Sequence, residues 1–187
     1  MDEKNMVKDI MAPIDEYEKI DENSHLGDAL RILKKKYEEQ KTGNTAISHK
    51  TMFVTDASKK IVGKLAMYDL IRGLVPETAI EPEVSRAYYS VLSSRALEVS
   101  EEVSEFQERF QWLHHSFGEL IKQEVHKKVK DIMSPVHPIL KENDSINQTI
   151  YIMFKENIHQ PLVVRDGEIT GVVDFMHIFD ELIETID

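Results

Sequence analysis

The sequence predicts an α/β protein made of two copies of one unit, with a helical segment inserted between them. Three observations lead to this prediction. The motif VKDIMAPI at residues 7–14 returns as VKDIMSPV at residues 129–136, a shift of 122 residues. Each motif is followed by apolar residues at helical spacing and then by two short runs of β-forming residues. Residues 76–126, between the copies, carry a separate apolar repeat that is typical of helices packed against helices.

The repeat continues beyond the motif, in the same order and with small changes in register. The further matching blocks are residues 20–23 with 140–143 at a shift of 120, 52–56 with 162–166 at 110, and 61–63 with 169–171 at 108. Ordered blocks separated by small deletions indicate a duplication. The sequence therefore predicts a first domain at 1–75, a helical insert at 76–126 and a second domain at 127–187.

Each copy is predicted to run in the order extended segment, helix, strand, strand, helix. Asn23-Ser24 and Asp144-Ser145 are the N-cap candidates for the first helix of each copy. A polar turn such as Arg165-Asp166-Gly167-Glu168 joins each pair of strands. The expected strands are Met52–Thr55, Ile61–Leu65, Leu162–Val164 and Ile169–Val173, and the expected closing helices are Met67–Leu74 and Phe175–Ile186.

The insert contains apolar residues that recur at alternating spacings of four and three. Such a seam predicts one long helix, or a helical hairpin with a break near Ser100. Three roles stay open for it: pairing with a second chain, folding back on the repeats, or receiving a protein partner. The seam consists of Leu92, Ala96, Val99, Val103, Phe106, Phe110, Leu113, Phe117 and Leu120.

Composition and charge exclude several classes of function. The net charge of −11 repels nucleic acid and anionic lipid, and the lack of cysteine removes disulfides and thiolate catalysis. The start of the chain is not a signal peptide and no run of 18 apolar residues occurs, so we expect a cytoplasmic protein that has no membrane contact. His114 and His115 are adjacent and point about 100° apart on a helix, so no metal site is predicted. No hydrolase, phosphate-loop or dinucleotide motif occurs, and we do not expect an enzyme.

The repeated motifs resemble those of the CBS domain, the cystathionine-β-synthase module, and the tandem arrangement resembles a Bateman pair. The resemblance covers residues 7–75 and 127–187. It depends on the VKDIM-x-P heads, the apolar strands before Asp56 and Asp166, and the segment Gly63–Leu70. It implies two α/β units about a pseudo-two-fold axis, often dimerising into a flat disc, with clefts that bind adenosine-type ligands. The implied ligands are AMP, ADP, ATP or S-adenosylmethionine, with no cofactor required.

The resemblance also implies where a ligand would be held. In the family, an Asp three residues after a Thr or Ser binds the ribose hydroxyls, because an ionised carboxylate only accepts hydrogen bonds. The first copy keeps Asp69, has Ala66 in the Thr position, and offers Lys64 as a source of positive charge. The second copy has Asp174 and His177 in the two positions, so we expect it to be empty or to take a neutral or cationic ligand. An Asp at this spacing can equally serve to cap the helix.

The adenine wall is expected to come from the segments after each DIM motif and from the paired strands. Flat apolar surfaces suit purines, and Met adapts to them, although simple core packing is the alternative for every one of these residues. The candidates are Met11, Pro13, Ile14, Phe53 and Val54 in the first copy, with Met52 beside them, and Met133, Pro135, Val136 and Leu162–Val164 in the second.

Together these residues favour a regulatory ligand-binding module. It would sense an adenosyl compound, form a homodimer and pass occupancy to an unidentified protein partner by conformational change. The alternative is a degenerate pair that binds no ligand and acts as a dimerisation or scaffold protein.

Overall fold

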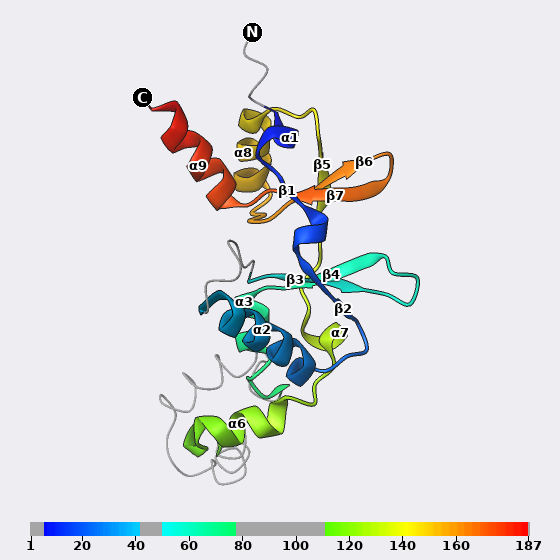
Figure 1. Cartoon of the computed structure of the whole chain (residues 1–187). Coiled ribbons are helices and arrows are strands. Elements are labelled where there is room, and N and C mark those ends of the chain that lie inside the picture. The colour runs from blue at the N-terminus through cyan, green and yellow to red at the C-terminus, as the bar shows by residue number, and fades with distance from the viewer. Residues whose placement is uncertain (1–5, 42–49, 78–110, 187) are drawn as a thin grey trace, which may run out of the picture. The chain divides into compact units, whose positions relative to one another are not determined.

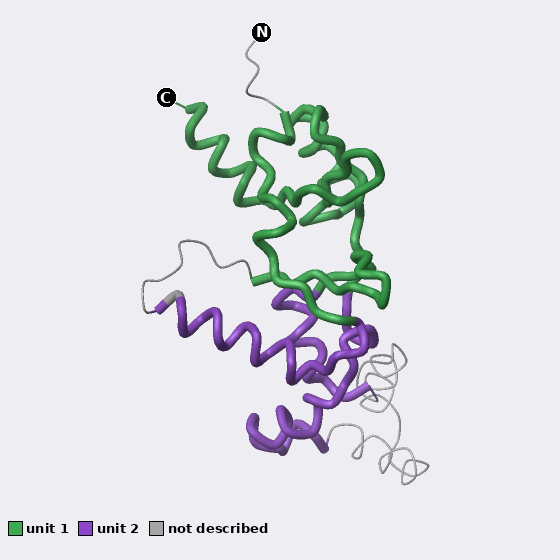
Figure 2. The backbone as a smooth tube through the Cα atoms, turned by 45° about the vertical axis from the view of Figure 1, so that its right-hand side comes forward, with its two compact units in different colours: residues 1–21, 49–64, 134–187 green, residues 22–48, 65–133 purple. Residues whose placement is uncertain are grey.

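The computed structural model describes residues 6–41, 50–77 and 111–186, and it divides the chain into two compact units (Figure 2). Unit 1 consists of residues 1–21, 49–64 and 134–187, and unit 2 of residues 22–48 and 65–133. Each unit takes segments from both copies, whereas the predicted domains 1–75 and 127–187 follow the sequence repeat. The seam residues from Leu92 to Phe110, with the expected break at Ser100, lie outside the described residues.

Unit 1 holds the β-sheets (Figure 1). The four-stranded sheet has the order β1-β7-β6-β5, in which β7 is antiparallel to both β1 and β6 and β5 is parallel to β6. The three-stranded sheet has the order β2-β3-β4, with β2 parallel to β3. The strands are β1 (Ala12–Pro13), β2 (Glu18–Asp21), β3 (Met52–Thr55), β4 (Ile61–Leu65), β5 (Pro138–Lys141), β6 (Leu162–Arg165) and β7 (Glu168–Val172).

The helices follow the order predicted from the repeat. Unit 1 contains α1 (Val7–Ile10), η1 (Ile14–Glu16), α8 (Ile146–Lys155) and α9 (Phe175–Thr185). Unit 2 contains α2 (Leu26–Lys41), α3 (Met67–Arg72), η3 (Gln111–His114), α6 (Phe117–Glu124) and α7 (Val129–Ile132). The orders β2-α2-β3-β4-α3 and β5-α8-β6-β7-α9 confirm the strand, helix, strand, strand, helix prediction. Among the described helices, none combines the length and the apolar character that a membrane crossing needs.

The two VKDIM heads differ from the extended segments that the sequence predicts. Each head forms one helical turn, α1 or α7, closed by a hydrogen bond from the residue after the turn back to its first residue. The Met11 N–H donates to the Val7 carbonyl and the Met133 N–H to the Val129 carbonyl, both at 2.9 Å. The residues that flank each turn are extended.

Local capping signals explain where the longer helices begin. Ser145 caps α8 as predicted, its hydroxyl accepting from the Gln148 N–H at 3.1 Å. The Asn23-Ser24 prediction is wrong by one residue: α2 begins at Leu26, and the N–H of the preceding His25 donates to the Asp28 carboxylate at 2.9 Å. An N3 carboxylate thus replaces a Ser or Asn side chain at this helix.

The described part of the insert excludes a single helix from Leu92 to Leu120. The turn η3 ends at His114, and Ser116 then caps a new helix, α6. The Ser116 N–H and hydroxyl both donate to the Glu119 carboxylate at 2.8 Å, while the Glu119 N–H donates back to the hydroxyl at 3.3 Å. Because this reciprocal cap sets a helix start, the seam is broken before Phe117.

The core of unit 1 lies between and beside its sheets. One cluster joins the two sheets and contains Ala12, Ile14, Tyr17, Phe53, Leu162 and Val172. A second cluster packs α1 against the four-stranded sheet and contains Val7, Leu140, Val163 and Val173. The Tyr17 and Phe53 rings meet edge to face, with centroids 5.2 Å apart.

Candidate functional site

Asp69 lies in the first turn of α3, where the sequence predicts it. Its side chain is buried, with 1% exposed, and its carboxylate accepts a hydrogen bond from the Ala66 N–H at 2.8 Å. Ala66 is the N-cap residue of α3 and offers no side-chain acceptor. Asp69 therefore has the capping role, and its ribose contact stays a prediction.

The C-terminal end of α3 is held by residues 124–132 of unit 2. The Lys127 ammonium donates to the Gly73 and Val75 carbonyls at 3.0 and 2.6 Å, and it pairs with the Glu124 carboxylate at 2.8 Å. The Arg72 guanidinium donates to the Ile132 carbonyl at 3.3 Å. The short helix that carries Asp69 is thus fixed at both of its ends.

In the second copy, the two candidate polar residues bind each other. The Asp174 carboxylate accepts from the Met176 and His177 N–H groups at 2.9 and 3.2 Å, and His177 Nδ1 accepts from the Asp174 N–H at 3.1 Å. These reciprocal hydrogen bonds make the pair a helix cap, in which the Asp174 carboxylate also lies 3.3 Å from His177 Nδ1. The expectation that Asp174 caps α9 is confirmed.

Tyr17, which the sequence analysis missed, lies close to this cap. Burial raises the pKa of the Tyr17 hydroxyl well above its usual range, and the negative charge of Asp174 raises it further. The ring packs on Phe53 in the core of unit 1. In the sequence, the one signal for Tyr17 is an aromatic residue shortly after the first head, and such a signal is weak.

The segment after the first head pairs with a strand of the second copy. Ala12 and Pro13 of β1 pair with Val172 and Gly171 of β7. Met11 lies so close to Gly171 that a Cβ there would fall 2.6 Å from the Met11 Sδ. Pro13 has no N–H to donate, and β1 is an edge strand, where proline is tolerated. Met11 and Pro13 therefore lie beside a strand of the second copy, and their contact with a purine stays a prediction.

The segment after the second head pairs in turn with a strand of the first copy. The Ser134 N–H donates to the Lys64 carbonyl at 3.0 Å, and the Lys64 N–H donates to the Ser134 carbonyl at 2.9 Å. Pro135 is exposed and Val136 packs against the shared core of unit 1, while Met133 is partly buried at the end of α7. The segment after each head thus follows a strand of the other copy.

The strand candidates lie in the interior. Phe53 and Val54 are fully buried, and Ile14 is 7% exposed in the same cluster as Phe53. The structure places these side chains in core packing, which is the alternative that the sequence left open. Their contact with a purine stays a prediction.

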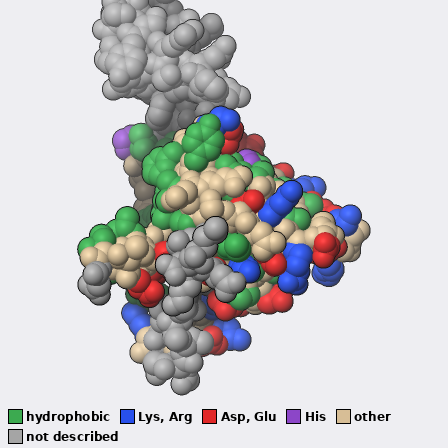
Figure 3. Space-filling view, turned by 90° about the horizontal axis from the view of Figure 1, so that it is seen from above, with side chains coloured by type: hydrophobic (Ala, Val, Ile, Leu, Met, Phe, Trp, Pro, Cys, Tyr) green, Lys and Arg blue, Asp and Glu red, His purple; other side chains and the backbone are tan. Residues whose placement is uncertain are grey.

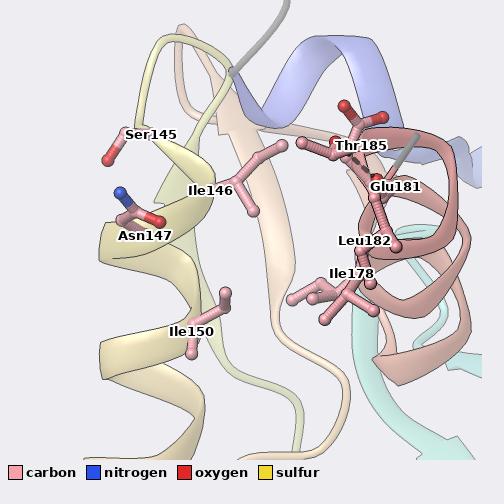
Figure 4. A pocket seen from close by; sticks show the side chains of 9 residues that line it. Ser145, Ile146, Asn147, Ile150, Ile178, Glu181, Leu182 and Thr185 are labelled. Carbon is pink, nitrogen blue, oxygen red and sulfur yellow. Dashed lines mark hydrogen bonds between the residues drawn. The ribbon is translucent and has the colours of Figure 1, made fainter.

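A separate apolar groove runs between α8 and α9 (Figure 4). Ile146 and Ile150 of α8 face Ile178 and Leu182 of α9 across a cavity of about 410 Å³. Its lining also includes Ser145, Asn147, Glu181, Thr185 and Ile186. A neighbouring cavity of about 440 Å³ is lined by Met153, Phe154, Phe175, Met176 and Phe179 together with groove residues. No signal in the sequence analysis singled this groove out.

Comparison with known proteins identifies the second copy. The family model described as "CBS domain" matches residues 129–184. This segment is a CBS domain. No curated protein sequence matches the chain.

Solved structures show that the CBS fold extends over both copies. CBSX2 in complex with AMP is 16% identical with a TM-score of 0.55, covering 96% of this chain and 97% of that chain. An uncharacterized conserved protein from Pyrococcus horikoshii is 13% identical with a TM-score of 0.57, covering 100% and 98%. The cytosolic domain of the Mg²⁺ channel MgtE in complex with ATP is 16% identical with a TM-score of 0.53, covering 96% of this chain and 49% of that chain. The chain therefore has the α/β fold of a CBS pair.

Proposed function

We propose that this CBS pair is a regulatory module that binds an adenine nucleotide or another adenosyl compound at Asp69. The observation that carries the proposal is the buried Asp69 carboxylate in the first turn of α3. The fold supports it by analogy, because structures of this fold are described in complex with AMP and with ATP. The proposal involves no catalytic step.

Ligand binding would act by shifting the equilibrium between conformations of the protein toward the one that binds the ligand better. A carboxylate accepts both ribose hydroxyl protons, so an adenosyl ligand that reaches Asp69 stabilises the arrangement in which this contact is made. A ligand favours one arrangement of the copies only by its differential affinity for that arrangement. A protein partner that recognises the arrangement would then read the occupancy.

We expect the equivalent position of the second copy to bind no anionic ligand. The Asp174 carboxylate and the His177 ring already satisfy each other's backbone N–H groups. A phosphate there would meet the Asp174 charge and would have to disrupt the cap of α9.

Thermal unfolding with AMP, ADP, ATP and S-adenosylmethionine tests the proposal. A ligand at 100 times its dissociation constant adds about 2.7 kcal/mol of stability. For a chain of this length, that shift corresponds to roughly 5–10 °C in Tm. Asp69→Asn keeps an oxygen that can accept from the Ala66 N–H but removes the charge that the ribose needs, so the shift should disappear.

Asp28→Asn is the matched control. Asp28 accepts from the His25 N–H at the start of α2, as Asp69 does from Ala66 at α3, and no ligand role is assigned to it. The ligand-induced shift should survive in this variant. A wild-type protein that none of the four compounds stabilises would contradict the sensor proposal.

The α8–α9 face favours a second candidate, a homodimerisation or scaffold function. Eight large apolar side chains of α8, α9 and the C-cap of α9 are exposed, and removing such side chains from water favours association. In Figure 3, hydrophobic side chains gather at the left of the face, the side on which Figure 1 draws α9. The residues are Tyr151, Phe154, Phe175, Met176, Phe179, Leu182, Ile183 and Ile186, each at least 40% exposed.

We propose that a second copy of the chain covers this face, because exposed apolar residues gathered on one face mark interaction surfaces. Light scattering should give twice the mass of one chain for the wild type. Phe154→Lys with Phe179→Lys should give the single-chain mass, and the control Leu113→Lys, at an exposed apolar residue of η3, should stay dimeric. A monomeric wild type, or a double variant that stays dimeric, would exclude this interface.

A further inference from the structure

A crevice of about 590 Å³ opens in unit 1 between the two β-hairpins. The turns of β3–β4 and β6–β7, which Figure 1 draws on the same side, both contribute to its lining. The lining residues are Ile14, Lys19, Ser58, Lys59, Lys60, Ile61, Pro138, Val164, Gly167, Glu168 and Ile169.

This crevice is not the candidate adenosyl site. Ile61 and Glu168 begin β4 and β7, whereas Asp69 and Asp174 follow the other ends of these strands. Five residues of extended strand span roughly 13 Å, so the crevice and the predicted ribose contacts lie at opposite strand ends. Of the adenosyl candidates, Ile14 alone lines the crevice.

The charge of the lining is opposite to that of the chain. Three lysines, Lys19, Lys59 and Lys60, line the crevice together with one glutamate, Glu168, in a protein of net charge −11. The Lys19 ammonium pairs with the exposed Asp15 carboxylate at 2.9 Å, and such exposed pairs contribute little. Among the residues that the structure describes, no ion pair occupies the ammonium groups of Lys59 and Lys60. An anion in the crevice would therefore find two uncommitted charges.

The turn before β4 is held in place by Asp56. The Asp56 carboxylate accepts from the Ser58 and Lys60 N–H groups at 2.8 and 2.9 Å. Lys59 has φ 64°, which interrupts the strand alternation that would send consecutive side chains to opposite faces. Both lysines can therefore line the same crevice.

The remaining walls are apolar. Ile61 and Ile169 occupy equivalent positions in the two copies and pack against the core cluster that joins the sheets. Val164 and Pro138 complete the wall, and Gly167 adds no side chain at the mouth. A ligand that matches this lining needs an apolar body beside its charge.

We propose that this crevice binds a small organic phosphate monoester, with the phosphate at Lys59 and Lys60 and the apolar body against Ile61 and Ile169. A phosphate monoester carries roughly two negative charges at neutral pH, which matches the two positive charges of Lys59 and Lys60. Lysine ammonium groups bind phosphate as point charges and without strict geometry, so a monoester fits this pair.

Titration of the full chain with phenyl phosphate, followed by amide resonances, tests the proposal. The amides of Lys59, Lys60, Gly167 and Glu168 should shift on binding. Benzyl alcohol, which lacks the charge, should not bind. Benzoate, with one charge, should bind about tenfold more weakly than phenyl phosphate, because it makes one charged hydrogen bond fewer.

Substitutions of the crevice lysines and of Glu168 should change the affinity for phenyl phosphate in opposite directions. Lys59→Gln with Lys60→Gln should weaken phenyl phosphate at least about tenfold, whereas Glu168→Gln should tighten it about threefold. The control Lys34→Gln with Lys35→Gln changes the net charge equally on α2 and should leave binding unchanged. Equal losses in the two lysine pairs, or unchanged binding in Lys59→Gln with Lys60→Gln, would overturn the proposal.

The adenosyl proposal for Asp69 and the phosphate proposal for the crevice can be tested independently of each other. The Asp69→Asn variant should bind phenyl phosphate as the wild type does, because Asp69 does not line the crevice. Loss of phenyl phosphate binding in Asp69→Asn would show that the two sites are not distinct and would overturn this inference.

Discussion

The exchange of the first head predicts that Gly171→Ala destabilises the protein. An added Cβ would fall 2.6 Å from the Met11 Sδ and 3.0 Å from the Ala12 carbonyl oxygen, and the latter is backbone that cannot turn aside. Overpacking of this kind costs about 1–3 kcal/mol. The reduced entropy of the unfolded chain returns about 0.4–1 kcal/mol. We therefore expect a net loss of about 1–2 kcal/mol in the free energy of unfolding.

Gly118→Ala is the matched control, since it makes the same chemical change with the opposite expected sign. Gly118 lies in α6 with no atom within 4 Å of its added Cβ, so this variant should gain about 0.5–1 kcal/mol. Urea denaturation at constant m-value measures both changes. Met11→Ala should relieve part of the Gly171→Ala loss in a double-mutant cycle. If Gly171→Ala stabilised the protein as Gly118→Ala does, β1 would not pack on β7 as described.

Three further predictions concern the helix ends and the core. Asp174→Ala should cost about 1–2 kcal/mol in urea denaturation, because two N–H groups of α9 lose their acceptor; a change below about 0.3 kcal/mol would contradict the cap. Lys127→Met should cost about 2–3 kcal/mol and leave the Glu124 carboxylate, 13% exposed, without this partner. The raised pKa of Tyr17 means that the unfolded chain ionises first, so stability is full below pH about 10 and falls as the pH rises further. Denaturation at pH 9 and 11 should show a smaller loss in Tyr17→Phe than in the wild type, and equal losses would refute the argument.

Local signals in the sequence predict the elements well. Met52–Thr55 and Ile61–Leu65 are confirmed as strands with the expected bounds, because short runs of β-forming residues end at polar turns. The Asp166-Gly167 turn is also confirmed, with φ values of 52° and 85° at its two central residues, as a two-residue hairpin requires. These features depend only on residues within a few positions of each other.

The parts that the sequence did not predict depend on distant backbone pairing. Nothing in VKDIMAPI shows that β1 will pair with β7, because the choice depends on which sheet edge is open after the rest has formed. Asp69 shows the same limit at the site. The Ala66-to-Asp69 spacing specifies the cap, and the capping bond is present, but spacing alone does not show which further groups the buried carboxylate contacts.

The pairing of β1 with β7 also constrains the order in which the chain folds. Ala12 leaves the ribosome long before its partner Val172, 160 residues later in the sequence. Contacts between residues so far apart in the sequence form late, because the pairing requires the closure of a long intervening loop, which costs conformational entropy. During synthesis, the segment after the first head therefore has no partner strand until nearly the whole second copy has been made.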